Sequence, residues 1–302
     1  LLDELLADTG GLGSDGRRHD VRATVFVECL AMYRADGPEA LRPVGETEFV
    51  AGLAATSASG AHGPTRAAAG IVGFADLRLG AAVREVLQAH LEAAHGRFRG
   101  IRHAAGWHAD ARIRHSHTKP PPGLLLDPRF RAGFAQLAPL DLSFDAWLYH
   151  PQLAELTDLA RAFPDTSIVL DHYGGPLGIG PYAGRADEVY ADWQRRIDEL
   201  ARCPNVVAKL GGLHMPINGH GWHKAPKPPD SAEIAAATAR YALHTIERFG
   251  PQRCMFESNF PVDKASCAYV VLWNAFKRLA AGFSADEKAA LFHGTATRVY
   301  RL

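Results

Sequence analysis

The chain has 302 residues, 47% of them hydrophobic, and its 33 Lys and Arg residues are matched by 33 Asp and Glu residues. This length suits one large α/β domain, so a single domain over residues 1–302 is predicted. The charge balance argues against nucleic acid or an anionic membrane as partner, because no surplus of basic residues is available to neutralise phosphates. A small-molecule substrate is the predicted partner, and the oligomeric state stays open, with a dimer as one option.

Short β-rich apolar runs alternate with amphipathic helical stretches, a pattern typical of βαβ units that build a parallel sheet. Strands are predicted at residues 23–27, 69–74, 98–102, 142–147, 167–171, 206–210 and 253–257. Helices are predicted at residues 83–94, 151–163, 188–201 and 231–249. A last helix is expected to start at Ser284, because Glu287 three residues later completes a capping box.

Eight strands close a (β/α)₈ barrel. We therefore predict the α/β class and a TIM-like (β/α)₈ barrel whose first strand is missing from this chain. The missing strand would precede Leu1, because residues 1–6 have the pattern of a helix interior and the chain lacks an initiator Met. The four cysteines form no C-x-x-C pair, which favours reduced thiols and a cytoplasmic protein over a disulfide framework.

Two long loops follow predicted strands, at residues 104–122 and 211–229. Loops of this length in a compact domain are usually functional, so we expect them to cover a site. Both are rich in histidine. A structural zinc site built from these histidines is disfavoured, because their spacing is loose and no paired thiols accompany them.

Active sites of α/β barrels lie at the carboxyl ends of the strands, and His172 follows the fifth predicted strand, before Gly174 and Gly175. A neutral imidazole there can bind a metal or move a proton near pH 7, or it can simply cap the strand.

Other polar residues end neighbouring strands. Arg102 offers a fork that suits a carboxylate or a polarised carbonyl, and its alternative is a structural ion pair with Asp145 or Glu28. Lys209 is a candidate carboxylate partner, desolvated base or Schiff-base lysine, with a structural ion pair as the alternative. Asn259 can form hydrogen bonds but cannot act as a general base at neutral pH.

Four sequence segments resemble the amidohydrolase-related proteins, in the branch of sugar lactonases and 2-pyrone-4,6-dicarboxylate lactonases. They are Leu-Asp-His-x-Gly-Gly-Pro at 170–176, Lys-Leu-Gly-Gly-Leu at 209–213, Glu-Ser-Asn-Phe-Pro-Val at 257–262 and the closing Leu-Phe-His-Gly-Thr-Ala-x-Arg-x-Tyr at 291–300. The resemblance extends from about residue 23 to residue 302. It implies a distorted TIM barrel and hydrolysis, mostly of lactones, although some relatives decarboxylate.

The resemblance transfers residue by residue. His172 matches a histidine that the family carries at its sixth strand, and Arg102 with His103 matches a basic pair on the fourth. Asn259 stands in the place of the family's Asp, and the family's His-x-His pair has no counterpart here. The resemblance therefore leaves the cofactor undecided. Zn²⁺ or Mn²⁺ could bind with His172 as a ligand, but the chain lacks the His-x-His pair and the Asp of the family.

The resulting hypothesis is a hydrolase that opens a small sugar-like or carboxylated lactone. His172 is the first candidate for the base, ahead of Asp263, Glu257 and Glu28, while Asn259 orients water or the leaving oxygen. Arg102 and Lys209 polarise the carbonyl or hold a substrate carboxylate. The residues expected to line the pocket with Lys209 are Glu28, His103, Tyr149 and His150. The alternatives are a metal-dependent decarboxylase of the same superfamily and a catalytically silent barrel that binds a small molecule.

Overall fold

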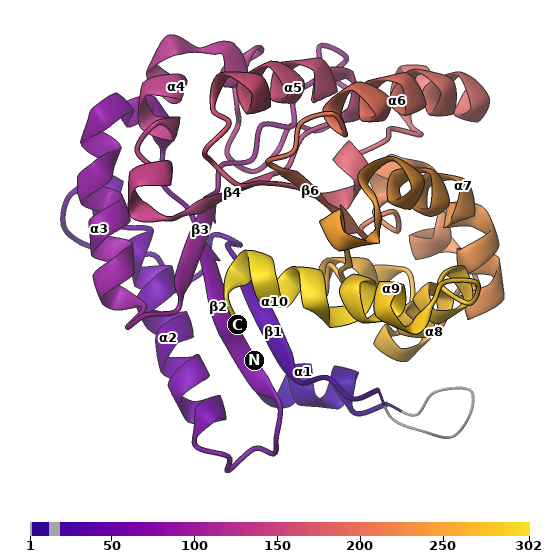
Figure 1. Ribbon diagram of the computed structural model, residues 1–302, viewed down its shortest axis with the longest axis horizontal. Coiled ribbons are helices and arrows are strands. Elements are labelled where there is room, and N and C mark those ends of the chain that lie inside the picture. The colour runs from indigo at the N-terminus through magenta and orange to yellow at the C-terminus, as the bar shows by residue number, and fades with distance from the viewer. Residues whose placement is uncertain (1, 12–18) are drawn as a thin grey trace.

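The computed structural model describes residues 2–11 and 19–302, and these form a curled parallel sheet surrounded by helices (Figure 1). The sheet has seven strands in the order β1-β2-β3-β4-β5-β6-β7, each parallel to its neighbours. The strands are β1 Ala23–Val27, β2 Arg66–Gly73, β3 Phe98–Arg102, β4 Ser143–Ala146, β5 Ile168–Leu170, β6 Val206–Leu210 and β7 Cys254–Phe256. The α/β class and the TIM-like arrangement predicted from the sequence are confirmed.

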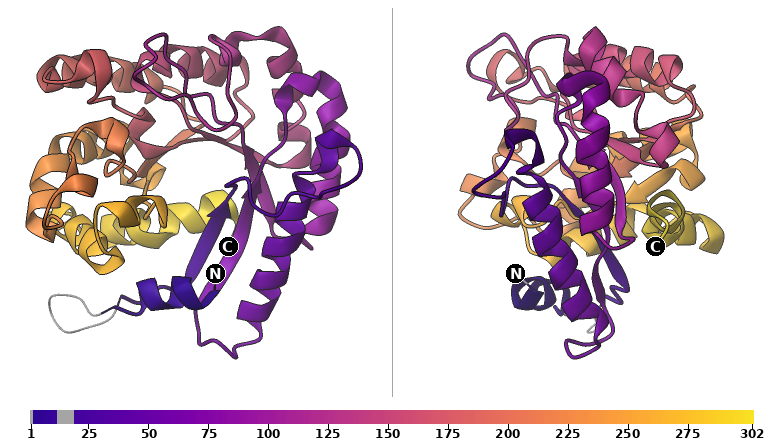
Figure 2. Two further views of the ribbon diagram at one scale, coloured as in Figure 1. Left: turned by 180° about the vertical axis from the view of Figure 1, so that it is seen from behind. Right: turned by 90° about the vertical axis from the view of Figure 1, so that its left-hand side faces the viewer.

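Helices alternate with the strands, and most of them cover the outside of the ring, as Figure 2 also shows. Their bounds are α1 Leu2–Thr9, α2 Val44–Ala58, α3 Val83–Ala93, α4 Pro128–Phe134, α5 Leu153–Ala162, α6 Ala186–Leu200, α7 Ser231–Phe249, α8 Tyr269–Leu279, α9 Ala285–Ala289 and α10 Thr295–Tyr300. The predicted capping box is present at α9, where the Ser284 side chain accepts from the Glu287 amide. No helix in the described residues is both long enough and apolar enough to cross a membrane.

Helix α2 was not among the predicted helices. Its buried positions include Gly45, Glu46 and Thr47 beside Val44 and Val50, so its inward face is not a continuous apolar stripe. Periodicity in the sequence detects amphipathic helices and gives little signal for such a segment. The structure places α2 against β2 and α3.

Two of the apolar clusters in the described residues pack on the two faces of the sheet. The larger lies between the outer faces of the strands and the helices, and includes Phe144, Ala208 and Trp193. The smaller lies inside the ring and consists of Val72, Val169, Val207, Met255, Val299 and Tyr300. The last two belong to α10, which reaches across the ring towards β1 and β2 in Figure 1. Tyr300 therefore stands in the barrel interior, below the carboxyl ends of the strands.

Candidate active site

Charged side chains meet inside the ring at the carboxyl ends of the strands. Alternation along each strand explains their direction: Phe144 and Ala146 pack in the outer core, so Asp145 between them faces the interior. Lys209, between Ala208 and Leu210, faces inward for the same reason. The group, here called the charged ring, consists of Glu28, Arg102, Asp145, Asp171, Lys209 and Glu257.

Lys209 lies at the centre of the charged ring. Its Nζ is 2.7 Å from Asp145 Oδ2, 2.9 Å from Asp171 Oδ1 and 3.7 Å from Glu257 Oε2. The Tyr300 hydroxyl donates to the same Asp145 oxygen at 2.7 Å. Burial by itself lowers the pKa of Lys209, but the charges of Asp145 and Asp171 outweigh it and hold that pKa well above its usual range. The geometry thus favours a fixed ammonium over a desolvated base.

Arg102 links the charged ring to β1. Its Nε donates to Glu28 Oε1 at 2.8 Å, one Nη donates to the Glu28 carbonyl at 2.6 Å, and the other reaches Asp171 Oδ2 at 3.4 Å. His117, from the loop after β3, brings its Nε2 within 3.1 Å of Glu28 Oε2. Burial raises the pKa of Glu28, but His117 and Arg102 outweigh it and the net direction is down.

His172 forms a pair with Glu257 across β5 and β7. The distance from His172 Nδ1 to Glu257 Oε1 is 2.5 Å. A carboxylate can only accept here, so Nδ1 carries the proton and Nε2 is left for other chemistry. Burial lowers the pKa of His172, whereas the charge and hydrogen bond of Glu257 raise it, and the net direction is up. The Trp147 ring and the imidazole pack in a T-shaped arrangement, with 4.8 Å between centroids.

The Gly211-Gly212 pair explains how this histidine fits. A Cβ at Gly212 would lie 2.4 Å from His172 Nδ1, and one at Gly211 would lie 2.2 Å from the Glu257 carbonyl oxygen. Gly212 also has a φ of +75°, which favours glycine. The glycines after β6 therefore leave the space in which His172 and Glu257 meet.

A second buried pair, Asp263 and His214, fixes the side chain of Asn259. Its Nδ2 donates to Asp263 Oδ1 at 2.9 Å, and the other Asp263 oxygen lies 2.8 Å from His214 Nδ1. Asp263 and His214 are both buried. This contact fixes the amide so that Asn259 Oδ1, an acceptor, points away from Asp263. Asp263 itself is engaged at both oxygens, which argues against it as the free base.

Three of the predicted pocket residues lie apart from the charged ring. His103 follows Arg102 directly, so it points to the helix side, where its Nδ1 accepts from the Leu77 amide and its ring packs on Phe130. His150 Nδ1 accepts from the Leu177 amide. Burial lowers the pKa of each histidine to about 4.

Tyr149 is the third of these residues. Its hydroxyl donates to the Arg114 carbonyl at 2.5 Å, which anchors the loop over residues 104–122. Glu28, Arg102, Lys209 and His172 are the predicted site residues that the structure brings together. Asp171 and Tyr300 complete the group without having been given a role, and Asp145, considered from the sequence only as an ion-pair partner of Arg102, pairs with Lys209 instead.

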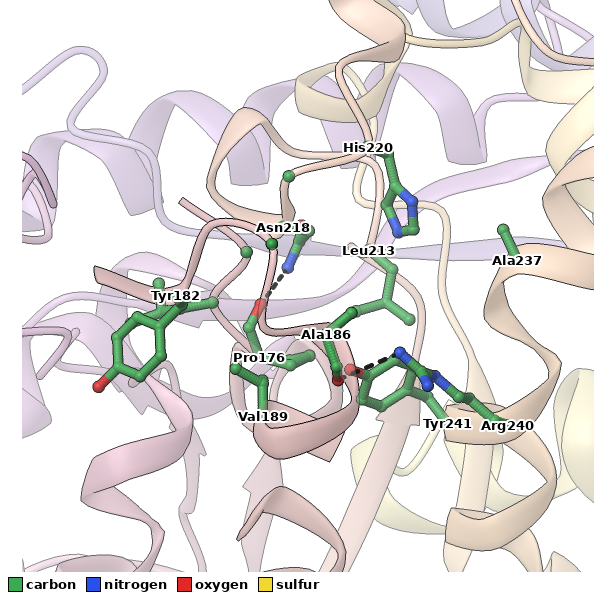
Figure 3. Close-up of a pocket in the computed structure, with 14 residues that line it drawn as sticks. Pro176, Tyr182, Ala186, Val189, Leu213, Asn218, His220, Ala237, Arg240 and Tyr241 are labelled. Carbon is green, nitrogen blue, oxygen red and sulfur yellow. Dashed lines mark hydrogen bonds between the residues drawn. The ribbon is translucent and has the colours of Figure 1, made fainter. Parts of the chain in front are cut away.

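Two cavities lie near the loops. One of about 610 Å³ is lined by Leu30 and by the loop from Trp107 to Lys119, including the His117 that contacts Glu28. The other, of about 190 Å³, lies between the loops after β5 and β6 and the helices α6 and α7 (Figure 3). Figure 3 shows Asn218 bonded to the Pro176 carbonyl and Arg240 to the Ala186 carbonyl at its wall. The larger cavity is the one that adjoins the charged ring.

The donor set of this site does not fit a divalent metal. Within the described residues no three His, Cys, Asp or Glu side chains are arranged to hold one. Lys209 and Arg102 occupy the carboxylates of the charged ring, Glu257 engages His172 Nδ1, and the side chain of Asn259 is neutral.

The chain is similar in sequence and in structure to known proteins. Residues 11–302 match the model of a family described as Amidohydrolase. An uncharacterized protein of Sinorhizobium fredii is 36% identical over 266 residues, which are 88% of this chain and 78% of that protein. An L-fucono-1,5-lactonase of Burkholderia multivorans is 30% identical over 235 residues, 78% of this chain and 72% of the relative. An amidohydrolase of Burkholderia multivorans, solved with bound zinc, is 26% identical, with a TM-score of 0.68 over 98% of this chain and 95% of that one.

Proposed function

Because the chain belongs to the amidohydrolase family, we propose that it is a hydrolase that opens a small cyclic ester. The observation that carries this proposal is the His172–Glu257 pair, which stands beside the cations of the charged ring. The similarity to an L-fucono-1,5-lactonase supports a lactone as the substrate class.

His172 is the general base in this proposal. With Nδ1–H donated to Glu257, the lone pair of Nε2 takes a proton from water as the water oxygen attacks the lactone carbonyl. The tetrahedral intermediate then expels the ring oxygen, and the imidazolium returns the proton to it, so that the products are one hydroxyl and one carboxylic acid, which ionises to a carboxylate by releasing its proton to solvent. Glu257 keeps the ring in the required tautomer and stabilises the imidazolium.

The cations of the charged ring provide the electrostatic part of the mechanism. Negative charge develops on the carbonyl oxygen in the transition state, and fixed cations in a water-poor site stabilise it more than they stabilise the ground state. Arg102, whose side chain is 14% exposed against 6% for Lys209, is the cation more open to a substrate. Asn259 Oδ1, fixed by Asp263, accepts a hydrogen bond from the attacking water.

A pH-stat assay over a panel of sugar lactones and pyrone carboxylates tests the proposal, with and without a chelator. Turnover of at least one lactone is expected, and it is expected to survive the chelator. His172→Ala should lower the rate on that lactone by at least ~100-fold. His62→Ala is the control, since His62 lies in an exposed loop before β2. An enzyme that hydrolyses no lactone, or a His172→Ala variant as fast as the wild type, contradicts the proposal.

A further inference from the structure

The cavity of about 610 Å³ beside the charged ring has a basic wall. Four of its lining side chains are Arg114, His115, His117 and Lys119, and none of the described residues that line it is Asp or Glu. Arg114 and Lys119 lie on an exposed part of the loop, where an arginine and a lysine are cations at neutral pH. A concave surface with charges of one sign attracts the opposite sign. The cavity therefore favours a ligand that carries an anionic group.

The rest of the wall is mostly apolar. Leu30 is 47% exposed, and the half-buried Trp107 packs its ring beside His115, with 5.8 Å between centroids. Ile113 also lines the cavity, and the described lining residues include no carboxylate or amide side chain. Such side chains are the acceptors that the hydroxyl groups of a sugar need. The wall thus suits an apolar ring better than a polyhydroxylated one.

The loop backbone that carries the two cations is fixed by hydrogen bonds. The Tyr149 hydroxyl donates to the Arg114 carbonyl at 2.5 Å. The hydroxyl of Thr118, the neighbour of Lys119, donates to the Ala104 carbonyl at 2.5 Å. Because these bonds order the loop before a ligand binds, they reduce the ordering cost of binding.

The cavity also adjoins the candidate base. His117 at its wall contacts Glu28 of the charged ring. Ile113 packs in an apolar cluster with Trp147, and the Trp147 ring packs on the His172 imidazole. A ring compound in the cavity is therefore close to both parts of the proposed reaction centre.

The cations inside the charged ring are already paired with carboxylates. Lys209 Nζ lies 2.7 Å from Asp145 and 2.9 Å from Asp171, and Arg102 donates to Glu28 at 2.8 Å. A permanent carboxylate on a substrate would compete with these side chains for the same donors. Arg114 and Lys119 are therefore the better partners for such a group.

We propose that the cavity holds an apolar ring that bears a carboxylate, and that Arg114 and Lys119 bind this carboxylate. Arg114 offers the planar fork that matches a carboxylate, and Lys119 adds a compact charge. Together with the proposed function, on which the assignment of a substrate rests, this makes the substrate a carboxylated lactone with an apolar ring. A neutral sugar lactone lacks the group that the two cations recognise.

Binding of benzoate to the full chain tests the anion site without any turnover, and benzamide is the neutral probe of the same shape. The indole N–H signal of Trp107, assigned by its loss in Trp107→Phe, reports binding in this cavity in an NMR titration. Benzoate should bind at least about tenfold more tightly than benzamide, and Arg114→Gln and Lys119→Gln should each weaken benzoate binding about threefold to fivefold. Neither substitution should change the binding of benzamide.

Arg112→Gln is the matched control. It removes an equal charge from the same loop, but Arg112 is paired with Asp110 and is not among the residues that line the cavity. Its affinity for benzoate should equal that of the wild type. The proposal is overturned if the wild type binds benzoate no better than benzamide, if both cavity variants bind benzoate as tightly as the wild type, or if Arg112→Gln weakens it as much as they do.

Turnover provides the second test, with a pyrone carboxylate and the corresponding carboxamide as substrates. The carboxamide should have the higher KM, and Arg114→Gln should raise the KM of the carboxylate about threefold to fivefold while kcat stays within about twofold. A chain that hydrolyses no lactone contradicts the proposed function, whereas the benzoate titration still decides the anion site. Hydrolysis of both compounds with equal KM overturns this inference and leaves the proposed function standing.

Discussion

Replacing Glu257 with Gln tests the catalytic pair, because it removes the negative charge but keeps a hydrogen-bond acceptor in nearly the same place. Two competing effects set the pKa of His172: burial lowers it, and Glu257 raises it more. Without the Glu257 charge, burial prevails, so the pKa of His172 should fall. The base form of His172 would then persist to lower pH.

The size of the effect on rate follows from the hydrogen bond. A hydrogen bond to a charged group contributes about 1.5–3 kcal/mol and a neutral one about 0.5–1.5 kcal/mol. The imidazolium formed in the transition state therefore loses roughly 1–1.5 kcal/mol of stabilisation in Glu257→Gln. Since about 1.4 kcal/mol corresponds to a factor of ten, kcat/KM on the high-pH plateau should fall about tenfold.

Two measurements check this prediction. The pH profile of kcat/KM should show its acidic limb displaced to lower pH together with the lower plateau. An NMR titration of the His172 imidazole reports the same pKa without any substrate, so it remains informative if the correct lactone has not been found. An unchanged imidazole pKa, or a limb displaced to higher pH, would refute the role given to Glu257.

Two further predictions concern Gly212 and His103. Gly212→Ala should lower activity at least about tenfold and destabilise the fold by about 1–3 kcal/mol, because the new Cβ would lie 2.4 Å from His172 Nδ1 at a φ of +75°. Turnover assays and urea unfolding measure the two effects. Gly184→Ala is the control, because Gly184 also has a positive φ but a Cβ there would meet nothing within 4 Å. For His103, burial lowers the pKa to about 4, below the ~6.5 of an unfolded chain, so its contribution to stability is present above pH 6.5 and is lost as the pH falls towards 4. Between pH 7 and pH 5 this histidine should account for about 2 kcal/mol of lost stability, and the loss measured by urea unfolding should be smaller by that amount in His103→Gln; an equal loss in both proteins would contradict the buried neutral state.

The sequence predicted the ring of strands well because its signals are local. Apolar runs of β-rich residues separated by helical periodicity depend on neighbours in the chain, and the strands found in the structure overlap each predicted run. The structure shortens β5 to Ile168–Leu170 and starts β2 at Arg66, three residues before the predicted run. Helix α8 lacked a prediction, although Leu272, Ala275, Phe276 and Leu279 are buried at helical spacing.

The sequence also predicts that polar side chains stand at the carboxyl ends of the strands, because the end of a strand can be located along the chain without knowledge of the neighbouring strands. It could not determine direction. Arg102 and His103 are adjacent, and alternation sends one to the charged ring and the other to the helix layer. Which of the two faces inward depends on the register of β3 with β2 and β4.

The hydrogen-bond and ion-pair partners of the site residues depend on the tertiary structure. Tyr300 and Asp145 are 155 positions apart in the chain, yet the closing helix places the hydroxyl against the carboxylate. Lys209 stays an ammonium because Asp145, Asp171 and Glu257, from three other strand ends, lie around it. The side-chain oxygen of Asn259 is free to accept because Asp263 accepts from its amide nitrogen. These contacts require burial and charges that the closure of the sheet brings together. No single segment of the sequence contains the residues for any of them.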